Sequence, residues 1–134
     1  MSCKSALYTA NTASQSVAVG GIIGLGSIIR RYGCAANLNG NMIPLNAPGY
    51  YNVEVSVTAA PTDAGVVTVS LYQDGNPVLG ATASVTAAAA ADNVNISFPA
   101  LVRLLCNTGV SNLTLVLSGE ASTVSNVAVV VEKV

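Results

Sequence analysis

The residue types that carry most enzyme chemistry are scarce in this sequence. Histidine is absent, which removes the commonest general base and the commonest metal ligand. A hydroxyl or thiol nucleophile would therefore need activation by a lysine or a carboxylate. Lys4 and Lys133 lie near the two ends of the sequence, and we expect both to face solvent. The sequence predicts no catalytic residue and no enzymatic activity.

The six acidic residues stand singly, so no pair or cluster is marked by its spacing. Asp63, Asp74 and Asp92 lie beside turn residues, where a carboxylate commonly accepts hydrogen bonds from its own backbone. A glycosidase needs two acids that face each other across a cleft, and nothing in the spacing indicates one. We predict turn-stabilising acids, with no metal site and no cofactor. A calcium site built from loop carboxylates is the alternative.

Three cysteines, Cys3, Cys34 and Cys106, complete the set of reactive side chains. They lack the paired close spacing of a metal site, and an odd count leaves at least one of them unpaired. We expect buried or half-buried thiols. One disulfide, or a bridge between subunits, is the alternative.

Gly20–Gly26 superficially resembles a nucleotide-binding loop, but no Lys-Ser or Lys-Thr pair follows it and no strand–loop–helix unit surrounds it. The stretch lies in the most apolar run, Val17–Ile29, whose thirteen residues are fewer than the roughly 20 that span a bilayer. We expect a strand and a glycine-rich loop here and no membrane span, with a membrane-active segment as the alternative. The glycines would allow bulges or close approach of subunits.

Composition predicts a domain that associates with copies of itself. Hydrophobic residues make up 51% of the chain and charged residues 8%, against roughly 25% charged in ordinary soluble domains. Such a surface carries too little charge to keep a monomer well solvated. With five basic residues and a net charge of −1, the sequence indicates no basic patch that could bind nucleic acid. We expect one domain over residues 1–134, with residues 1–20 as an N-terminal arm or an edge strand.

The elements that must position these residues are strands. Residues 50–58 alternate strictly, so Tyr51 and Val53 should be buried while Tyr50 is exposed. We expect most of the tyrosines to pack in the core. Pro48-Gly49 and Asp74-Gly75 are strong turn signals. The predicted strands are Leu7–Asn11, Gln15–Val19, Ile22–Tyr32, Asn41–Leu45, Tyr50–Ala59, Val66–Gln73, Ala81–Thr86, Asn93–Phe98, Leu101–Cys106, Asn112–Leu117 and Val124–Glu132.

The last segment, Asn126–Lys133, is apolar on both faces of the strand it predicts. Strands with that pattern are buried on both sides. In a small two-layer protein the second buried face most simply belongs to a neighbouring subunit. A central strand beneath a covering loop is the alternative.

Two segments resemble the jelly roll of the C1q and tumour-necrosis-factor superfamily: Ala47–Val53, with its Pro-Gly-Tyr turn before a central strand, and Val69–Gly75, which ends in an Asp-Gly hairpin. The resemblance covers residues 40–134. The composition of the chain, rich in Ala, Val and Thr with a cysteine near the N-terminus, is similar to that of small jelly-roll proteins of Firmicutes and their bacteriophages. It implies an all-β, antiparallel two-sheet jelly-roll sandwich that forms a homotrimer around one sheet. Carried over by position, the axis-facing or core residues are Tyr51, Val53, Val127, Val129 and Val131.

The function that this resemblance implies is structural. We expect a capsid decoration or a head or tail fibre trimer of a bacteriophage particle, with further copies, the major capsid protein or other virion proteins, and a host surface glycan as partners. No apolar core of a secretory signal is visible in Met1–Tyr8, which favours cytoplasmic assembly and a location on the virion. The alternative is an interaction module of the bacterial cell or spore surface that binds carbohydrate or protein. The absence of a Gly-X-Y tract disfavours the collagen-headed version of such a module.

Overall fold

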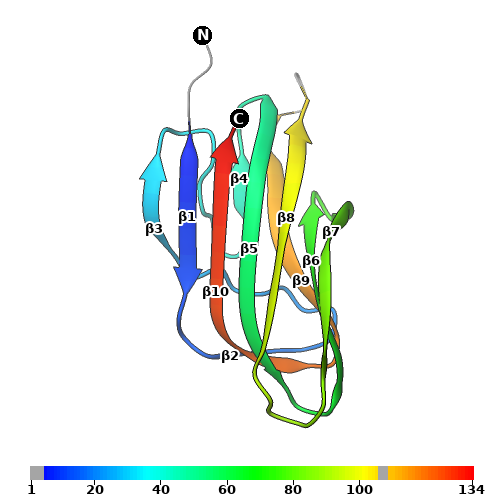
Figure 1. Cartoon of the computed structure of the whole chain (residues 1–134). Helices are drawn as coiled ribbons and strands as arrows, with labels where there is room; N and C mark the ends of the chain where they lie inside the picture. Colours follow the sequence, from blue (N-terminus) through cyan, green and yellow to red (C-terminus); the bar gives the residue numbers. More distant parts are fainter. Residues whose placement is uncertain (1–4, 106–108) are drawn as a thin grey trace.

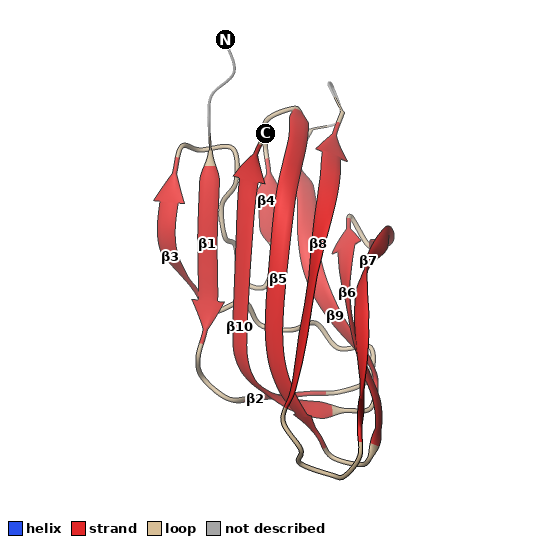
Figure 2. Ribbon diagram, in the orientation of Figure 1, coloured by secondary structure: helices blue, strands red, loops and turns tan. Residues whose placement is uncertain are grey.

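The computed structural model describes residues 5–105 and 109–134, which form ten strands in two antiparallel sheets and no helix (Figure 1; Figure 2). The two sheets pack face to face, and the fold is the antiparallel jelly-roll sandwich that the sequence predicted. The strands are β1 (Ala6–Asn11), β2 (Gln15–Val17), β3 (Ser27–Tyr32), β4 (Ile43–Leu45), β5 (Gly49–Pro61), β6 (Gly65–Gln73), β7 (Asn76–Ala87), β8 (Val94–Leu104), β9 (Ser111–Gly119) and β10 (Ser122–Lys133).

Neighbouring strands of each sheet are mostly distant in the sequence. The six-stranded sheet has the order β3-β1-β10-β5-β8, with β2 also paired to β10, and the four-stranded sheet has the order β4-β9-β6-β7. The last strand, β10, therefore lies between the first strand and the long central strand β5 (Figure 1). This arrangement joins the two ends of the chain in one sheet, so the sandwich closes only when both are present.

The core lies between the sheets and is built from every second side chain of the long strands. In β5 and β10 buried and outward residues alternate, and the register places Val129 opposite Val55. Tyr51 is fully buried, and its hydroxyl donates a hydrogen bond to the Ala47 carbonyl oxygen at 2.5 Å. That bond satisfies the one polar group this side chain brings into the core.

Asp74 and Gly75 form the β6–β7 turn, with φ angles of 53° and 82°. These left-handed values suit Asp-Gly in a tight hairpin, so the predicted turn is confirmed. The Asp74 carboxylate, however, accepts hydrogen bonds from the Ser111 hydroxyl at 2.6 Å and the Asn112 backbone N–H at 2.9 Å. The prediction that this acid would bond its own backbone is wrong, because β9 begins beside the turn and offers its first donors to the carboxylate.

The predicted strand over residues 22–32 is too long. Ile22 makes a single bridge to Val116, and a regular strand begins only at Ser27. Between them Gly26 has a φ of 81°, and a Cβ at that position would collide with the Ala10 carbonyl oxygen. The apolar residues of this stretch therefore lie in a loop that the glycines allow to pass close to β1.

Two other strand predictions are also wrong. The segments 93–98 and 101–106 were expected as separate strands, but residues 94–104 form one strand, β8, with Pro99 inside it. Because β8 is an edge strand, the missing N–H of Pro99 is tolerated. The strand predicted to begin at Ala81 begins instead at Asn76, directly after the hairpin turn.

The N-terminal strand is not at an edge. β1 lies between β3 and β10, so residues 6–11 form an inner strand rather than an arm or an edge strand. The edge of this sheet opposite β8 is β3, which pairs with β1 after the glycine-rich loop.

Candidate interaction surface

The five residues that the resemblance singled out all lie in the core of one subunit. Tyr51, Val53, Val127, Val129 and Val131 are each at most 1% exposed. Their side chains face the four-stranded sheet, so none of them is available to a second copy. The outward residues that alternate with them are the ones that could meet a partner.

We call the outward side of the six-stranded sheet the outer sheet face. Its middle row crosses four strands in register, with Tyr8 on β1, Val130 on β10, Glu54 on β5 and Pro99 on β8. The rows on either side continue it. The outer sheet face comprises Ala6, Tyr8, Ala10, Ser27, Arg30, Tyr32, Tyr50, Asn52, Glu54, Ser56, Ser97, Pro99, Leu101, Arg103, Ala128, Val130 and Glu132.

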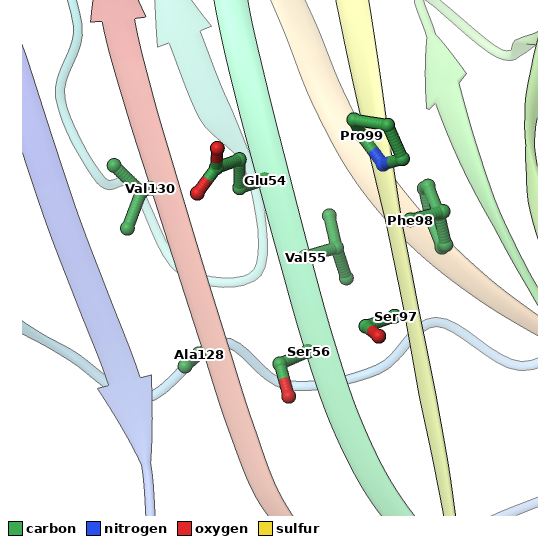
Figure 3. A pocket seen from close by; sticks show the side chains of 8 residues that line it. All are labelled: Glu54, Val55, Ser56, Ser97, Phe98, Pro99, Ala128 and Val130. Carbon is green, nitrogen blue, oxygen red and sulfur yellow. The ribbon is translucent and has the colours of Figure 1, made fainter.

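Small side chains hollow the middle of this face. The row next to Glu54 consists of Ala128, Ser56 and Ser97, and beside it lies an open depression of about 410 Å³. Figure 3 shows the Glu54 carboxylate extending from β5 toward Val130 on β10, with the short side chains below it. The depression is therefore shallow, largely apolar and marked by one carboxylate.

Few charges lie on the outer sheet face. Its carboxylates are Glu54 and Glu132. Its cations are Arg30 on β3, in register with Tyr8, and Arg103 at the other end, whose guanidinium is 5.8 Å from the centre of the Tyr50 ring. That distance is within the range of a cation–π contact. Apart from these groups the outer sheet face, as defined above, is built from apolar, hydroxyl and amide side chains.

A second apolar patch lies where β7 and β8 border the same side of the sandwich (Figure 1). We call Val78 and Leu79 of β7, together with Pro99 and Leu101 at the β8 border of the outer sheet face, the edge patch; they line a hollow of about 390 Å³. Leu79 is 98% exposed and Leu101 61% exposed. Leucines so fully uncovered on neighbouring strands are typical of a surface that meets a partner.

The tyrosines are mostly at the surface, so the prediction that most of them pack in the core is wrong. Only Tyr51 is buried, whereas Tyr32 is 69% exposed and Tyr50, as predicted, is exposed. Tyr8, Tyr32 and Tyr50 occupy outward positions of the six-stranded sheet, on the side away from the core. Burial raises the pKa of Tyr51 above its ordinary value of 10.0.

The structure brings one serine beside one carboxylate, Ser111 and Asp74. A carboxylate that accepts bonds from a hydroxyl and a backbone N–H ties two strands together, and this pair lies at the start of β9 rather than in a cleft. Cys34 is exposed, against the expected burial, because it lies in the loop after β3; Cys3 and Cys106 lie outside the described residues. Within residues 5–105 and 109–134, no cluster of potential metal ligands and no helix capable of crossing a membrane is found.

Sequence reasoning missed the residues of both patches, but signals for some of them were present. The polar positions of the alternating segment 50–58 already mark Glu54 and Ser56 as outward, and the doubly apolar last segment contains Val130. Leu79 was missed because its strand was expected to begin two residues later. No sequence signal places β7 beside β8, since that proximity depends on the packing of the two sheets.

No protein-family model matches the sequence, and no curated protein matches it either. Solved structures do match in fold. They include murine APRIL (TM-score 0.76, 11% identity, 98% of this chain and 100% of that chain), the globular domain of zebrafish complement 1qA (0.67, 11%, 95% and 94%) and the PRD1 vertex protein P5 (0.64, 14%, 97% and 96%). At these identities the likeness concerns the fold alone, and it supports the C1q and tumour-necrosis-factor type of jelly roll.

Proposed function

We propose that this chain is a non-enzymatic structural subunit that forms a homotrimer and belongs to a bacteriophage particle, as a capsid decoration or a fibre component. The observation that carries the proposal is the outer sheet face: a broad, sparsely charged sheet surface on a chain with only 8% charged residues. A surface of that kind is stable in water when copies of the chain cover it.

The edge patch supplies the complementary half of the contact. A patch that meets a different patch on the next copy gives a head-to-tail interface, and such interfaces form a ring if the rotation closes. In the proposed trimer the edge patch of each subunit, centred on Leu79, packs on the outer sheet face of the next, at the depression beside Val130 and Ala128. The edge patch offers no cation to Glu54, so this carboxylate stays at the solvated rim of the contact.

The available surface is large enough for this arrangement. One subunit exposes 6776 Å². A stable interface buries about 800 Å² on each partner. With two contacts per subunit, a closed ring would bury roughly a quarter of the surface of each chain.

The particle role rests on a fold likeness and on composition. A phage vertex protein, PRD1 P5, shares this fold, and the few charges suit a subunit held permanently in an assembly. The major capsid protein or other virion proteins would be the contacts on the particle, and loops at the free end could present a surface to a host glycan. The second candidate, a module of the bacterial cell or spore surface, is favoured by the likeness to the C1q globular domain.

Mass spectrometry of gradient-purified phage particles and of purified spores from the source culture tests the location. We expect peptides of the segment 112–133 in the particles at an abundance comparable to that of known structural subunits. Peptides found only on spores or cell envelopes would overturn the virion role in favour of the surface module.

A further inference from the structure

We propose that the free edge of β3 binds an extended acidic segment of a partner protein as an added strand. β3 is the outermost strand of the six-stranded sheet, at the edge opposite β8 (Figure 1). The site is therefore separate from the edge patch of the proposed trimer and does not depend on it.

The exposure of β3 is the first observation. All six of its residues, Ser27–Tyr32, are exposed on both faces, whereas β5 and most of β10 bury every second residue. β1 pairs with one side of β3, and no described strand pairs with the other. Backbone N–H and C=O groups on that side are a ready template for an incoming strand.

Charge is the second observation. Arg30 and Arg31 are the charged residues of β3, and as neighbours in a strand they point to opposite faces. The Arg31 guanidinium is held by the Gly33 carbonyl oxygen at 3.3 Å and the Asn37 side-chain oxygen at 2.9 Å. No described residue pairs with the Arg30 guanidinium. An acidic strand would thus meet a cation on each of its two faces.

The surroundings of Arg30 provide room for a side chain. Tyr8, Arg30, Tyr32 and Glu132 line a hollow of about 310 Å³ whose floor is Ala6. Glu132 lies on β10, two strands from Tyr32 with Ala6 between them, so it faces the hollow from the far side. The side of the hollow next to the edge is therefore basic and aromatic, and an acidic side chain entering from the edge meets Arg30 first.

A second copy of this chain does not fit the same edge. Symmetric pairing of two β3 strands would bring the Arg30-Arg31 pairs of both copies together, and like charges placed opposite each other destabilise a sheet. The chain also has no acidic run to offer, because its six acids stand singly. The occupant is therefore a different protein that contributes an extended, acid-rich segment.

The test uses the full chain and two fluorescent ten-residue peptides, one alternating valine with glutamate and one alternating valine with lysine. Fluorescence anisotropy should show binding of the glutamate peptide, weakening with added salt, and none of the lysine peptide. The double variant R30E/R31E should bind the glutamate peptide at least about tenfold more weakly, since loss of a charge-assisted contact is worth about one order of magnitude. The matched control is R103E, on the opposite edge strand, which should bind as the parent does.

Hydrogen exchange separates strand addition from a simple ionic contact. On binding the glutamate peptide, alternate backbone amides of residues 27–32 should gain protection. Equal binding of both peptides, equal binding by R30E/R31E, or binding without protection of β3 would each overturn the proposal. Light scattering that shows pairing of copies abolished by R30E/R31E would overturn it in favour of a second copy as the occupant.

Discussion

Val129 and Val130 are neighbours in β10, yet an aspartate should have opposite consequences at the two positions. Val129 is 1% exposed and faces the core, whereas Val130 is half-buried on the outer sheet face. Even as the protonated acid, a carboxyl group without partners costs about 2–7 kcal/mol when moved from water to an apolar site. That is a large share of the roughly 5–15 kcal/mol that keeps a domain folded, so V129D should not fold.

At position 130 the cost falls on assembly instead. In a free subunit the new carboxylate faces water, and its main cost is repulsion from Glu54 directly opposite, about 0.2–1 kcal/mol. In the proposed trimer it would be buried unpaired, at about 3–5 kcal/mol for each contact. Because 1.4 kcal/mol is a factor of ten, each contact should weaken a hundred- to several-thousand-fold.

Circular dichroism and light scattering coupled to size exclusion distinguish the two outcomes. We expect V130D to give a β-sheet spectrum and the mass of a single chain, and V129D to give the spectrum of an unfolded or aggregated chain. A folded V130D that keeps the mass of the parent assembly at micromolar concentration would refute the placement of the outer sheet face in the interface.

Three further predictions concern stability. The Thr9 hydroxyl is fully buried and has no hydrogen-bond partner among the described residues, so T9V should raise the free energy of unfolding by about 1 kcal/mol or more, measured by urea denaturation; a loss of stability would contradict this. D74A should lower the free energy of unfolding by about 1–3 kcal/mol, because the Ser111 hydroxyl and a β9 amide lose their acceptor. Exposed Asp63 serves as the control, and D63A should change the free energy of unfolding by less than about 0.5 kcal/mol. Because the pKa of Tyr51 is raised in the folded state, its contribution to the free energy of unfolding is fully present below pH 10.0 and is lost as the pH rises through the folded-state pKa. The parent should therefore lose stability above pH 10.0 more steeply than Y51F; equal slopes would contradict the assignment.

Local sequence signals predicted the elements that depend on local rules. The strict alternation of residues 50–58 gave the inward and outward sides of β5, because a strand has a period of two. The Asp-Gly pair gave the β6–β7 hairpin, because the turn needs left-handed φ values. The spacing of the turns predicted an all-β sandwich, and the jelly-roll class was implied by the resemblance of residues 47–53 and 69–75 to the C1q and tumour-necrosis-factor superfamily.

Features that depend on the assembled sandwich could not be read from the sequence. Pro99 looked like the end of a strand and is tolerated only because β8 is an edge. Tyr32 is exposed because it points outward from the six-stranded sheet, and Cys34 is exposed because it lies in the loop after β3. The edge patch needed the two sheets to be packed before Leu79 and Leu101 could be seen together.

The mass of the purified parent chain in solution tests the central claim most directly. Native mass spectrometry, with light scattering over a range of concentrations, should give about 40 kDa, three times the 13.4 kDa of one chain, and the value should hold on dilution. A mass of 13.4 kDa at micromolar concentration would contradict the account, since the outer sheet face and the edge patch would then both stand uncovered in water.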